Sequence, residues 1–410
     1  MFDVNEVRKD FPMLQGKTMN GKPLVYFDNA ATTFKPQCVI DAVNRFYTEI
    51  TSNIHRGDYE LAYQTDTAYE NCRKTVSEFL NCKPEEIVFT SGASASLNLV
   101  AYGYGRKFLK KGDVILSTEA EHASNILPWF KVVEETGAVL EYIPLDETGR
   151  VTVENFRKVM HDGVKVVTMA AVTNVLGYDA PVKEICAIAH EYGAVVVVDG
   201  AQSVPHEKTD VSDLDCDFLA FSSHKLCGPS GIGVLYGKYE LLEKTDPFML
   251  GGGSNARFDI CGNILLKQPP YKFEAGTPNI EGVLGMDAAI RYLMNLGMDN
   301  IHRYEKELHD YLEEKITQLD NIILYNPKGD TGIVTFNVKD IFAQDAAGYL
   351  NFQGIAVRSG NHCAKILINF LRVGETIRSS LYFYNTKEEV DQMIEALKTC
   401  TIENCVSTFF

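Results

Sequence analysis

The chain has 410 residues, of which 45% are hydrophobic and 23% charged, a composition typical of a globular protein with a sizeable buried core. Its 39 lysines and arginines against 55 aspartates and glutamates give a formal net charge of −16, which disfavours binding to nucleic acid or to an anionic membrane surface. At roughly 150 residues per domain, the length predicts one large unit with a smaller one appended.

The N-terminal residues and the apolar runs bear on where the protein resides. Acidic residues stand at the N-terminus where a signal peptide would have a basic flank. The longest apolar runs, such as residues 194–198, are far shorter than the roughly 20 residues that a membrane span needs. We therefore expect a soluble cytoplasmic protein that acts on small molecules, with no membrane and no nucleic acid among its partners.

Ten cysteines are scattered along the chain without CxxC spacing. In a chain large enough to fold unaided, most of them are expected to be reduced and buried, with one a candidate for reactivity. Cys400 and Cys405 together could bind a metal, but no second pair of ligands lies near them in the sequence. We therefore expect no metal site.

The middle of the chain alternates short β-branched runs with helical patterns, which is typical of βαβ units around a parallel sheet. A helix is expected over residues 182–192, because apolar residues recur there every three or four positions and Gly193 follows as a stop signal. The pattern predicts a doubly wound α/β core. Its strands are expected at residues 86–90, 113–117, 139–143, 165–170, 195–198 and 218–221.

From about residue 282 the pattern changes to long helical stretches, followed by a strand-like run at 332–338 and a final helix at 387–399. This change predicts a second, smaller α+β domain. The predicted division gives residues 15–285 to a large domain, and residues 286–410 together with residues 1–14 to a small one. Residues 400–410 give no readable signal.

Polar residues that directly follow buried strands are the first candidates for a functional site, because ligands of open α/β folds bind at the carboxyl ends of the strands. Asp199 follows one such run, and Gln202 lies just beyond it. A carboxylate at this position could hold a protonated ring nitrogen. The alternative is that Asp199 is only the N-cap of a helix, a position that Asp prefers.

A second candidate is Lys225, which follows another buried run where the chain turns through Gly and Pro. It can form a Schiff base, while Ser222 and His224 can donate to a phosphate; a surface charge is the alternative role. The third candidate is the turn SGAS at residues 91–94, where free backbone N–H groups and a hydroxyl at a helix start can bind a phosphate. Together the three describe a site for pyridoxal 5'-phosphate (PLP).

The motifs around these residues carry a family resemblance over almost the whole chain. In chain order they are VRKDFPML, YFDNAATTFKP, SNIHRGDYELA, EHASNILPW, TNVLGYDAPV, VDGAQSVPH, FSSHKLCGP, FEAGTPNI, RSGNHCA and RSSLYFYNT. With them the sequence resembles the SufS-type cysteine desulfurases, class V aminotransferase-like PLP enzymes of fold type I. The resemblance implies a large domain with a mainly parallel sheet, a smaller α+β C-terminal domain and a homodimer.

The resemblance also implies roles around the cofactor. Lys225 would hold PLP covalently, and Asp199 would keep the ring nitrogen protonated. Gln202 would contact the phenolic oxygen, His122 would stack on the ring and transfer protons, and Asn174 would lie along the edge of cofactor or substrate. Phosphate contacts would come from Gly92, the backbone of Ala93, Ser94, Ser222, His224 and, across the dimer interface, Thr277.

Two further segments of the resemblance concern the substrate. Arg378, with Arg358 and Asn174 as further contacts, would clamp the α-carboxylate of an amino acid, although an isolated arginine is more often one half of a surface ion pair. Cys363 would be the nucleophile, and the nearby Arg358, His362 and Lys365, which are cationic or can become so, would favour its thiolate form. A buried structural role for Cys363 is disfavoured, because a loop with Ser, Gly and Asn is a poor core segment.

The activity implied is that of a cysteine desulfurase, which converts L-cysteine to L-alanine, leaves the sulfur as a persulfide on Cys363 and supplies it to iron–sulfur cluster assembly. The short stretch between Cys363 and Arg378 keeps the persulfide close to the cofactor pocket, and the resemblance then implies a small sulfur-acceptor protein of the SufE or SufU type. Alternatives are a selenocysteine lyase, another PLP-dependent class V aminotransferase-like enzyme, and a non-catalytic protein that binds an iron–sulfur cluster. The last is disfavoured, because a scaffold has no use for Lys225 and Asp199 together with Arg378.

Overall fold

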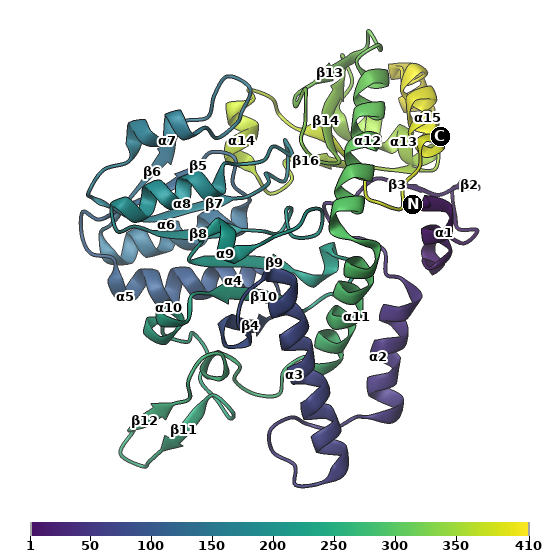
Figure 1. The fold of residues 1–410 in the computed structure, drawn as a ribbon. Helices are drawn as coiled ribbons and strands as arrows, with labels where there is room; N and C mark the ends of the chain where they lie inside the picture. The colour runs from purple at the N-terminus through teal and green to yellow at the C-terminus, as the bar shows by residue number, and fades with distance from the viewer. Residues whose placement is uncertain (1, 409–410) are drawn as a thin grey trace.

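The computed structural model describes residues 2–408 and shows an α/β protein with two main sheets, which confirms the predicted fold class (Figure 1). The larger sheet has seven strands in the order β4-β10-β9-β8-β7-β5-β6, and only β10 runs antiparallel to its neighbours. The strands are β4 (Ile87–Thr90), β5 (Val114–Thr118), β6 (Val139–Ile143), β7 (Val164–Ala170), β8 (Val195–Asp199), β9 (Phe218–Ser222) and β10 (Gly233–Gly237).

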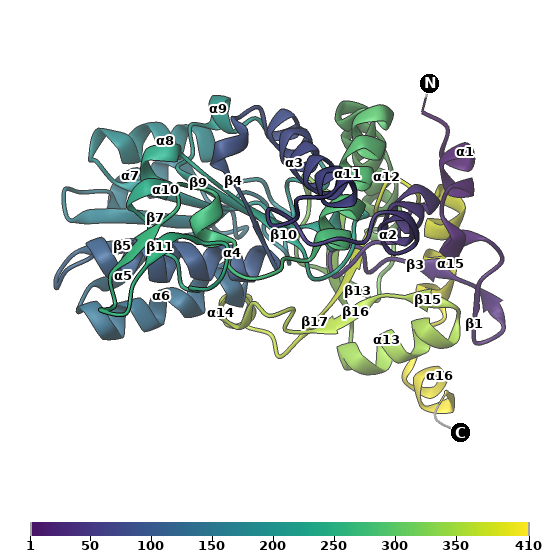
Figure 2. The ribbon, with the colours of Figure 1, turned by 90° about the horizontal axis from the view of Figure 1, so that it is seen from below.

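The inner strands of this sheet are covered on both faces, so their β-branched residues are buried whichever way they point. Val197 packs in one cluster with residues of α4 and α6, whereas Val196 and Val198 pack in another with residues of α3, α7, α8 and α11. Figure 2 shows α6 and α8 on opposite sides of the sheet. None of the helices within residues 2–408 combines the length and apolarity that crossing a bilayer requires. The helices of this unit are α2 (Gln37–Glu49), α3 (Glu60–Leu80), α4 (Ala93–Val100), α5 (Arg106–Phe108), α6 (Ala123–Thr136), α7 (Val153–Val159), α8 (Val182–Glu191), α9 (Val211–Leu214), α10 (Tyr239–Lys244) and α11 (Ile280–Leu296).

The C-terminal unit is built on a four-stranded antiparallel sheet in the order β13-β14-β17-β16. Strand β3 from the N-terminal part lies with this unit, because it pairs in parallel with β15 and Phe27 beside it is buried in the same core. The domain boundaries expected from the sequence stay a prediction. The elements are β3 (Val25–Tyr26), α12 (Met298–Ile316), β13 (Ile322–Leu324), β14 (Ile333–Val338), α13 (Ala343–Phe352), β15 (Ile355–Ala356), β16 (Arg358–Gly360), α14 (Lys365–Phe370), β17 (Thr376–Ser380), α15 (Lys387–Lys398) and α16 (Ile402–Ser407); α1 (Val4–Lys9) and the β1 (Thr18–Met19) and β2 (Lys22–Pro23) hairpin precede them.

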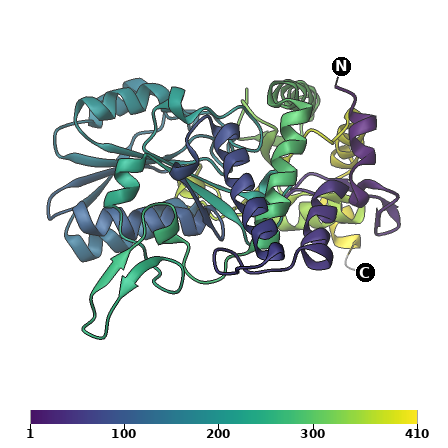
Figure 3. The ribbon, with the colours of Figure 1, turned by 60° about the horizontal axis from the view of Figure 1, so that its bottom comes forward.

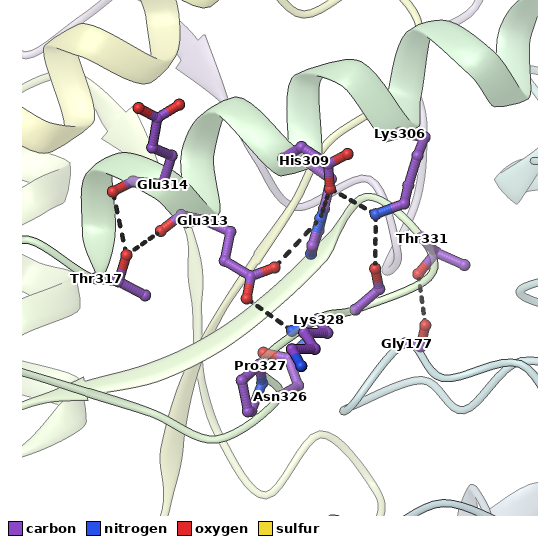
Figure 4. A network of polar contacts seen from close by, with 12 residues as sticks. Gly177, Lys306, His309, Glu313, Glu314, Thr317, Asn326, Pro327, Lys328 and Thr331 are labelled. Carbon is purple, nitrogen blue, oxygen red and sulfur yellow. Dashed lines mark hydrogen bonds and ion pairs between the residues drawn. The ribbon is translucent and has the colours of Figure 1, made fainter.

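A polar network joins the C-terminal unit to the loop between β7 and α8 (Figure 4). Glu313, one turn after His309 on α12, accepts a hydrogen bond from the N–H of Lys328 at 2.7 Å. Thr331, from the same loop as Lys328, donates to the carbonyl oxygen of Gly177 at 3.0 Å. The C-terminal unit therefore holds a loop of the large unit that carries one of the predicted site residues.

Side chains of the kinds that bind metal ions come together at one place within residues 2–408. One cluster of three occurs, on α12 around His309, and the ammonium group of Lys306 already forms an ion pair there. Cys400 and Cys405 lie with their Sγ atoms 3.7 Å apart in the core of the C-terminal unit, and no third ligand groups with them in the described part of the chain.

The tail differs from the sequence expectation. The helix expected at 387–399 is present as α15, but it is not the last one, because α16 follows it. Thr401 caps α16 by accepting from the N–H of Asn404, and Cys405 is buried in the core. So short a helix depends on its cap and on tertiary burial, which hydrophobic periodicity over a few residues does not reveal.

Candidate active site

A cavity of about 190 Å³ lies where the carboxyl ends of β7, β8 and β9 meet the C-terminal unit. The first turns of α4 and α6 line it from one side, and β16, β17 and the loop after β16 from the other. Thr277 is exposed and lies outside it, so its contact across a dimer interface stays a prediction. The predicted site residues that line the cavity are Ala93, Ser94, His122, Asn174, Asp199, Gln202, Ser222, His224, Lys225, Arg358, Cys363 and Arg378.

Lys225 ends the 3-10 turn that directly follows β9, which places its side chain at the cavity. Burial is the main cause of a lowered pKa of Lys225, which falls to about 8, and Asp199 opposes the shift. The guanidinium groups of Arg378 and Arg358 act in the same direction as burial. Because the neutral amine is the form that attacks a carbonyl carbon, this environment prepares Lys225 for Schiff-base chemistry.

The lowered pKa of Lys225 makes the loading of PLP onto the apoprotein depend on pH. The rate at which bound PLP develops its visible absorbance should rise with pH with a midpoint of about 8, because only the neutral amine reacts. Stopped-flow absorbance between about pH 6 and pH 10 measures it. Lys365→Ala, which removes an exposed lysine, should leave this profile unchanged, whereas a pH-independent rate in the unmodified protein would contradict the expectation.

Asp199 is the last residue of β8 and is buried, with Oδ1 accepting from the N–H of Ala201 at 3.0 Å. Burial raises its pKa, against this hydrogen bond and the charge of Lys225. Residues 201–206 form turns rather than a regular helix, so the alternative role as a helix N-cap is not met. A buried carboxylate is stabilised by a cationic partner, and a protonated pyridine nitrogen would supply one.

The start of α4 and the end of β9 form a polar cradle. Gly92 adopts a φ of 150°, which favours glycine, and a Cβ atom there would lie 3.3 Å from Oγ of Ser222. That hydroxyl oxygen accepts from the N–H of Ala93 at 2.8 Å, and Oγ of Ser94 lies 2.6 Å from Oγ of Ser124. Hydroxyls and N–H groups at a helix start suit a phosphate. Ser124 was not among the predicted site residues, although it lies in the EHASN motif.

Three neutral imidazoles line the cavity, those of His122, His224 and His362. His122 caps α6 with Nδ1 accepting from the N–H of Ser124 at 3.1 Å, so the proton of its neutral ring lies on Nε2. Burial, followed by the charge of Lys225, lowers the pKa of His122 to about 4. The same two causes lower the pKa of His224 to about 4. A neutral ring with a free N–H suits His122 for stacking on a flat cofactor and for donating a hydrogen bond.

Arg378 on β17 is buried and is therefore not half of a surface ion pair. Nη1 donates to the carbonyl oxygen of Asn174 at 2.8 Å, and Nη2 to Oδ1 of Asp28 at 3.3 Å. Arg358 lies directly opposite it on β16. Burial lowers the pKa of Arg378 to about 10; Asp28 opposes the shift and Arg358 adds to it. Because the guanidinium groups of Arg358 and Arg378 have only the carboxylate of Asp28 beside them within residues 2–408, a net positive charge remains. This charge suits the α-carboxylate of an amino acid.

Cys363 is exposed and lines the cavity, so it is not a buried structural cysteine. Its carbonyl oxygen accepts from the N–H of Ala123 at 2.7 Å, and that of His362 accepts from Nδ2 of Asn174 at 2.8 Å. His362 and Cys363 have φ values of 50° and 56°, in the left-handed region that non-glycine residues rarely adopt. Such strain concentrates at functional sites, where the surrounding structure enforces it.

The expectation that His362 can become cationic beside Cys363 is wrong. Burial, followed by the charges of Arg378 and Arg358, lowers the pKa of His362 to about 3. Its Nε2 lies 3.0 Å from Oγ1 and 3.2 Å from the carbonyl oxygen of Thr376; because a carbonyl only accepts, Nε2 carries the single proton. The positive charge near the thiol therefore comes from other groups, among them Arg378 and Lys225, which both interact electrostatically with Cys363.

Several buried polar atoms at the cavity have no partner within the described chain. They are Oδ1 of Asn174, Oε1 of Gln202, Nδ1 of His362 and Nε of Arg378. The other polar atom of the Gln202 amide, Nε2, donates to the carbonyl oxygen of Ala30 at 2.9 Å. An unpaired buried polar atom costs about 1–3 kcal/mol, so these atoms indicate a polar ligand. Asp199 could pair with the ring nitrogen of PLP, the cradle at the start of α4 could bind its phosphate, and the amine of Lys225 could react with its aldehyde. The residues of the cavity therefore fit PLP.

The chain is similar to known proteins over almost its whole length. The model of the aminotransferase class-V family matches residues 25–393. Probable cysteine desulfurases of Halalkalibacterium halodurans and Staphylococcus aureus are each 45% identical, over 97% of this chain and 97% and 96% of theirs. Two solved structures of cysteine desulfurases share the fold. That of Thermococcus onnurineus NA1 has a TM-score of 0.92 and 38% identity, over 96% of this chain and 97% of its own. That of Escherichia coli, in an S-sulfonic acid form, has a TM-score of 0.90 and 34% identity, over 99% of both chains. The chain therefore belongs to the aminotransferase class-V family of PLP-dependent enzymes.

Proposed function

We propose that this protein is a cysteine desulfurase, which uses PLP to convert L-cysteine to L-alanine and leaves the sulfur as a persulfide on Cys363. The observation that carries the proposal is that the amine of Lys225, the thiol of Cys363 and the buried Arg378 line one cavity. A Schiff-base lysine, a thiol nucleophile and a guanidinium for a carboxylate are what desulfuration of an amino acid needs. Relatives that match 97% of this chain are named for the same activity.

The side chains divide the reaction among them. When bound, PLP withdraws electrons from the α-carbon of the amino acid. Arg378 binds the α-carboxylate, and the neutral amine of Lys225 removes the Cα proton. The thiolate of Cys363 then attacks the substrate sulfur: an S–S bond forms, the C–S bond breaks, and its electron pair stays with the carbon. The carbon skeleton regains the Cα proton and gains one at Cβ, so the reaction needs no external oxidant.

Mass spectrometry after exposure of the holoprotein to L-cysteine tests the proposal. The peptide that contains Cys363 should gain the mass of one sulfur atom while L-alanine accumulates. Cys261 is also exposed but lies outside the cavity, so its peptide should not gain sulfur. L-alanine formed without sulfur on Cys363 would contradict the proposal and favour the lyase alternative.

We further propose that the sulfur on Cys363 passes to a small acceptor protein of the SufE or SufU type. This acceptor would then supply the sulfur to iron–sulfur cluster assembly. The chain after Cys363 supports it, because Leu367 of α14 is buried in a cluster with Val175 and Leu176, which tethers the thiol close to the cavity. An acceptor must then bring its own thiol to Cys363. Without added thiol reductant, turnover should rise severalfold with such an acceptor, and equal rates would contradict this. The cytoplasmic location stays a prediction.

We also propose that the protein forms a homodimer. The hairpin of β11 (Asn255–Phe258) and β12 (Ile264–Leu266) projects from the body of the molecule (Figures 1 and 3). Phe258, Ile260 and Leu265 on it are exposed, and an exposed apolar patch of this kind is typical of a protein interface. Light scattering should give the mass of two chains, and Ile260→Asp with Leu265→Asp should shift it toward one. A single-chain mass in the unmodified protein would contradict the dimer.

A further inference from the structure

A buried carboxyl group lies directly before His122 without lining the cavity. Glu121 is 3% exposed, and both of its oxygens accept hydrogen bonds. Oε1 accepts from Oγ1 of Thr118 at 2.7 Å and from the N–H of Ala170 at 3.1 Å, and Oε2 accepts from Nδ2 of Asn125 at 2.7 Å. The three donors belong to the end of β5, the end of β7 and the first turn of α6, so one carboxyl group ties three elements together.

The network continues into the sheet. Oδ1 of Asn125 accepts from Oγ1 of Thr168 on β7 at 2.7 Å, so both polar atoms of this amide have partners. Burial raises the pKa of Glu121 to about 7 against its hydrogen bonds, and the charge of Asp199 on β8 adds to the shift. Enclosing a carboxyl group here therefore costs stability that an apolar side chain of similar size would not. Packing alone does not account for Glu121.

The start of α6 is what the network positions. His122 follows Glu121 directly and lines the cavity. The next residue, Ala123, donates its N–H to the carbonyl oxygen of Cys363 at 2.7 Å. Ala170, whose N–H Glu121 accepts, also lines the cavity. The cavity wall and the loop of the proposed nucleophile thus both depend on where this helix begins.

We propose that Glu121 is a positioning residue for the desulfuration: its carboxyl group fixes the first turn of α6, so that His122 faces the cavity and Ala123 holds the loop of Cys363. The kinetic consequences rest on the function proposed above, whereas the placement of α6 is a property of the folded chain. Misplacing a reacting group by about 1 Å costs up to about a hundredfold in rate. Loss of the carboxyl group should lower kcat more than it raises KM, because Arg378, which binds the substrate carboxylate, lies on another element.

Two variants separate positioning from packing. Glu121→Gln keeps the size of the side chain but offers one acceptor oxygen in place of two, so one of the three donors loses its acceptor. The double variant Glu121→Gln/Asn125→Asp restores the pattern with the roles exchanged: the new amide donates to the new carboxylate, which still accepts from Thr168. Glu119→Gln makes the same chemical change two residues away, outside this network, and is the matched control.

Kinetics and fluorescence provide the readouts. Glu121→Gln should lower kcat about tenfold with KM for L-cysteine within about twofold, and the double variant should recover kcat to within about threefold of the unmodified protein. Trp129, the one tryptophan of the chain, lies buried on α6, so its emission in the apoprotein reports on the helix independently of turnover. This emission should change in Glu121→Gln and return in the double variant. The affinity for PLP, measured by quenching of this emission, should follow the same order.

Unchanged kcat, Trp129 emission and PLP affinity in Glu121→Gln would overturn the proposal, and so would a double variant that is no better than the single one. If Glu121→Gln does not fold, the double variant decides: a kcat near that of the unmodified protein supports positioning, and a low one overturns it. If the unmodified protein forms no L-alanine, the proposed function fails, and the emission and PLP titration of the apoproteins still decide the role of Glu121.

Discussion

Lys225→Ala should abolish the formation of L-alanine from L-cysteine, with a loss of about 10⁴-fold. Two roles depend on this amine, covalent retention of PLP and removal of the Cα proton, and within residues 2–408 no other lysine lines the cavity. PLP should still enter the cradle at the start of α4, but borohydride should no longer fix it to the protein. Alanine assays and absorbance after reduction and dialysis measure the two effects.

Lys365→Ala is the matched control for this variant. Lys365 is exposed and lies two residues after Cys363, so its loss changes the local charge without removing an amine from the cavity. It should retain turnover and reductive fixation of PLP. The assignment of Lys225 would be wrong if peptide mapping located the reduced cofactor on a different lysine.

Cys363→Ser should separate the binding of PLP from the transfer of sulfur. The thiol does not hold the cofactor, so the visible absorbance of the holoprotein should be nearly unchanged. Alanine formation should fall at least about a hundredfold, because a serine hydroxyl has no accessible anionic form near neutral pH. The loop should keep its shape, since its anchors from Ala123 and Asn174 reach backbone carbonyl oxygens. Absorbance spectra and alanine assays of the same sample measure both.

Cys261→Ser is the control, because this cysteine is also exposed and lies outside the cavity. It should behave like the unmodified protein in both measurements. Each change is at an exposed position, so the free energy of unfolding should move by no more than about 0.5 kcal/mol. Substantial desulfuration by Cys363→Ser would mean that this thiol is not the acceptor of sulfur.

Hydrophobic patterning was enough to place the strands around the site. Strand β6 spans the expected residues 139–143, and β8 and β9 each extend one residue further than expected, to Asp199 and Ser222. Each polar residue therefore still belongs to the end of its strand. Strand β10 was not expected, because the glycines at its ends weaken the β signal. Gly233 is needed there, since a Cβ atom would lie 2.5 Å from Cα of Gly92.

The chemistry of the site was also readable from local segments. Asp199 ends a buried strand, whereas Lys225 and the turn before α4 each follow one, and parallel strands bring their carboxyl ends to one edge. The segments that contain Cys363 and Arg378 could be singled out only by their resemblance to a family, because no periodic pattern marks either residue. Their roles stay proposals that the variants above test.

Contacts between distant segments were decided by the tertiary structure alone. Asp28 reaches Arg378 across 350 positions of the chain, and no local pattern indicates that pair. Likewise, the sequence shows that His362 adjoins Cys363, but its neutral state follows from burial beside Arg378 and Arg358. Sequence determines which side chains follow which strand, because strand propensity and strand ends are local properties. Burial, charge state and hydrogen-bond partners depend on what the folded chain brings together, and so Glu121 acquires its three donors only when β5, β7 and α6 are in place.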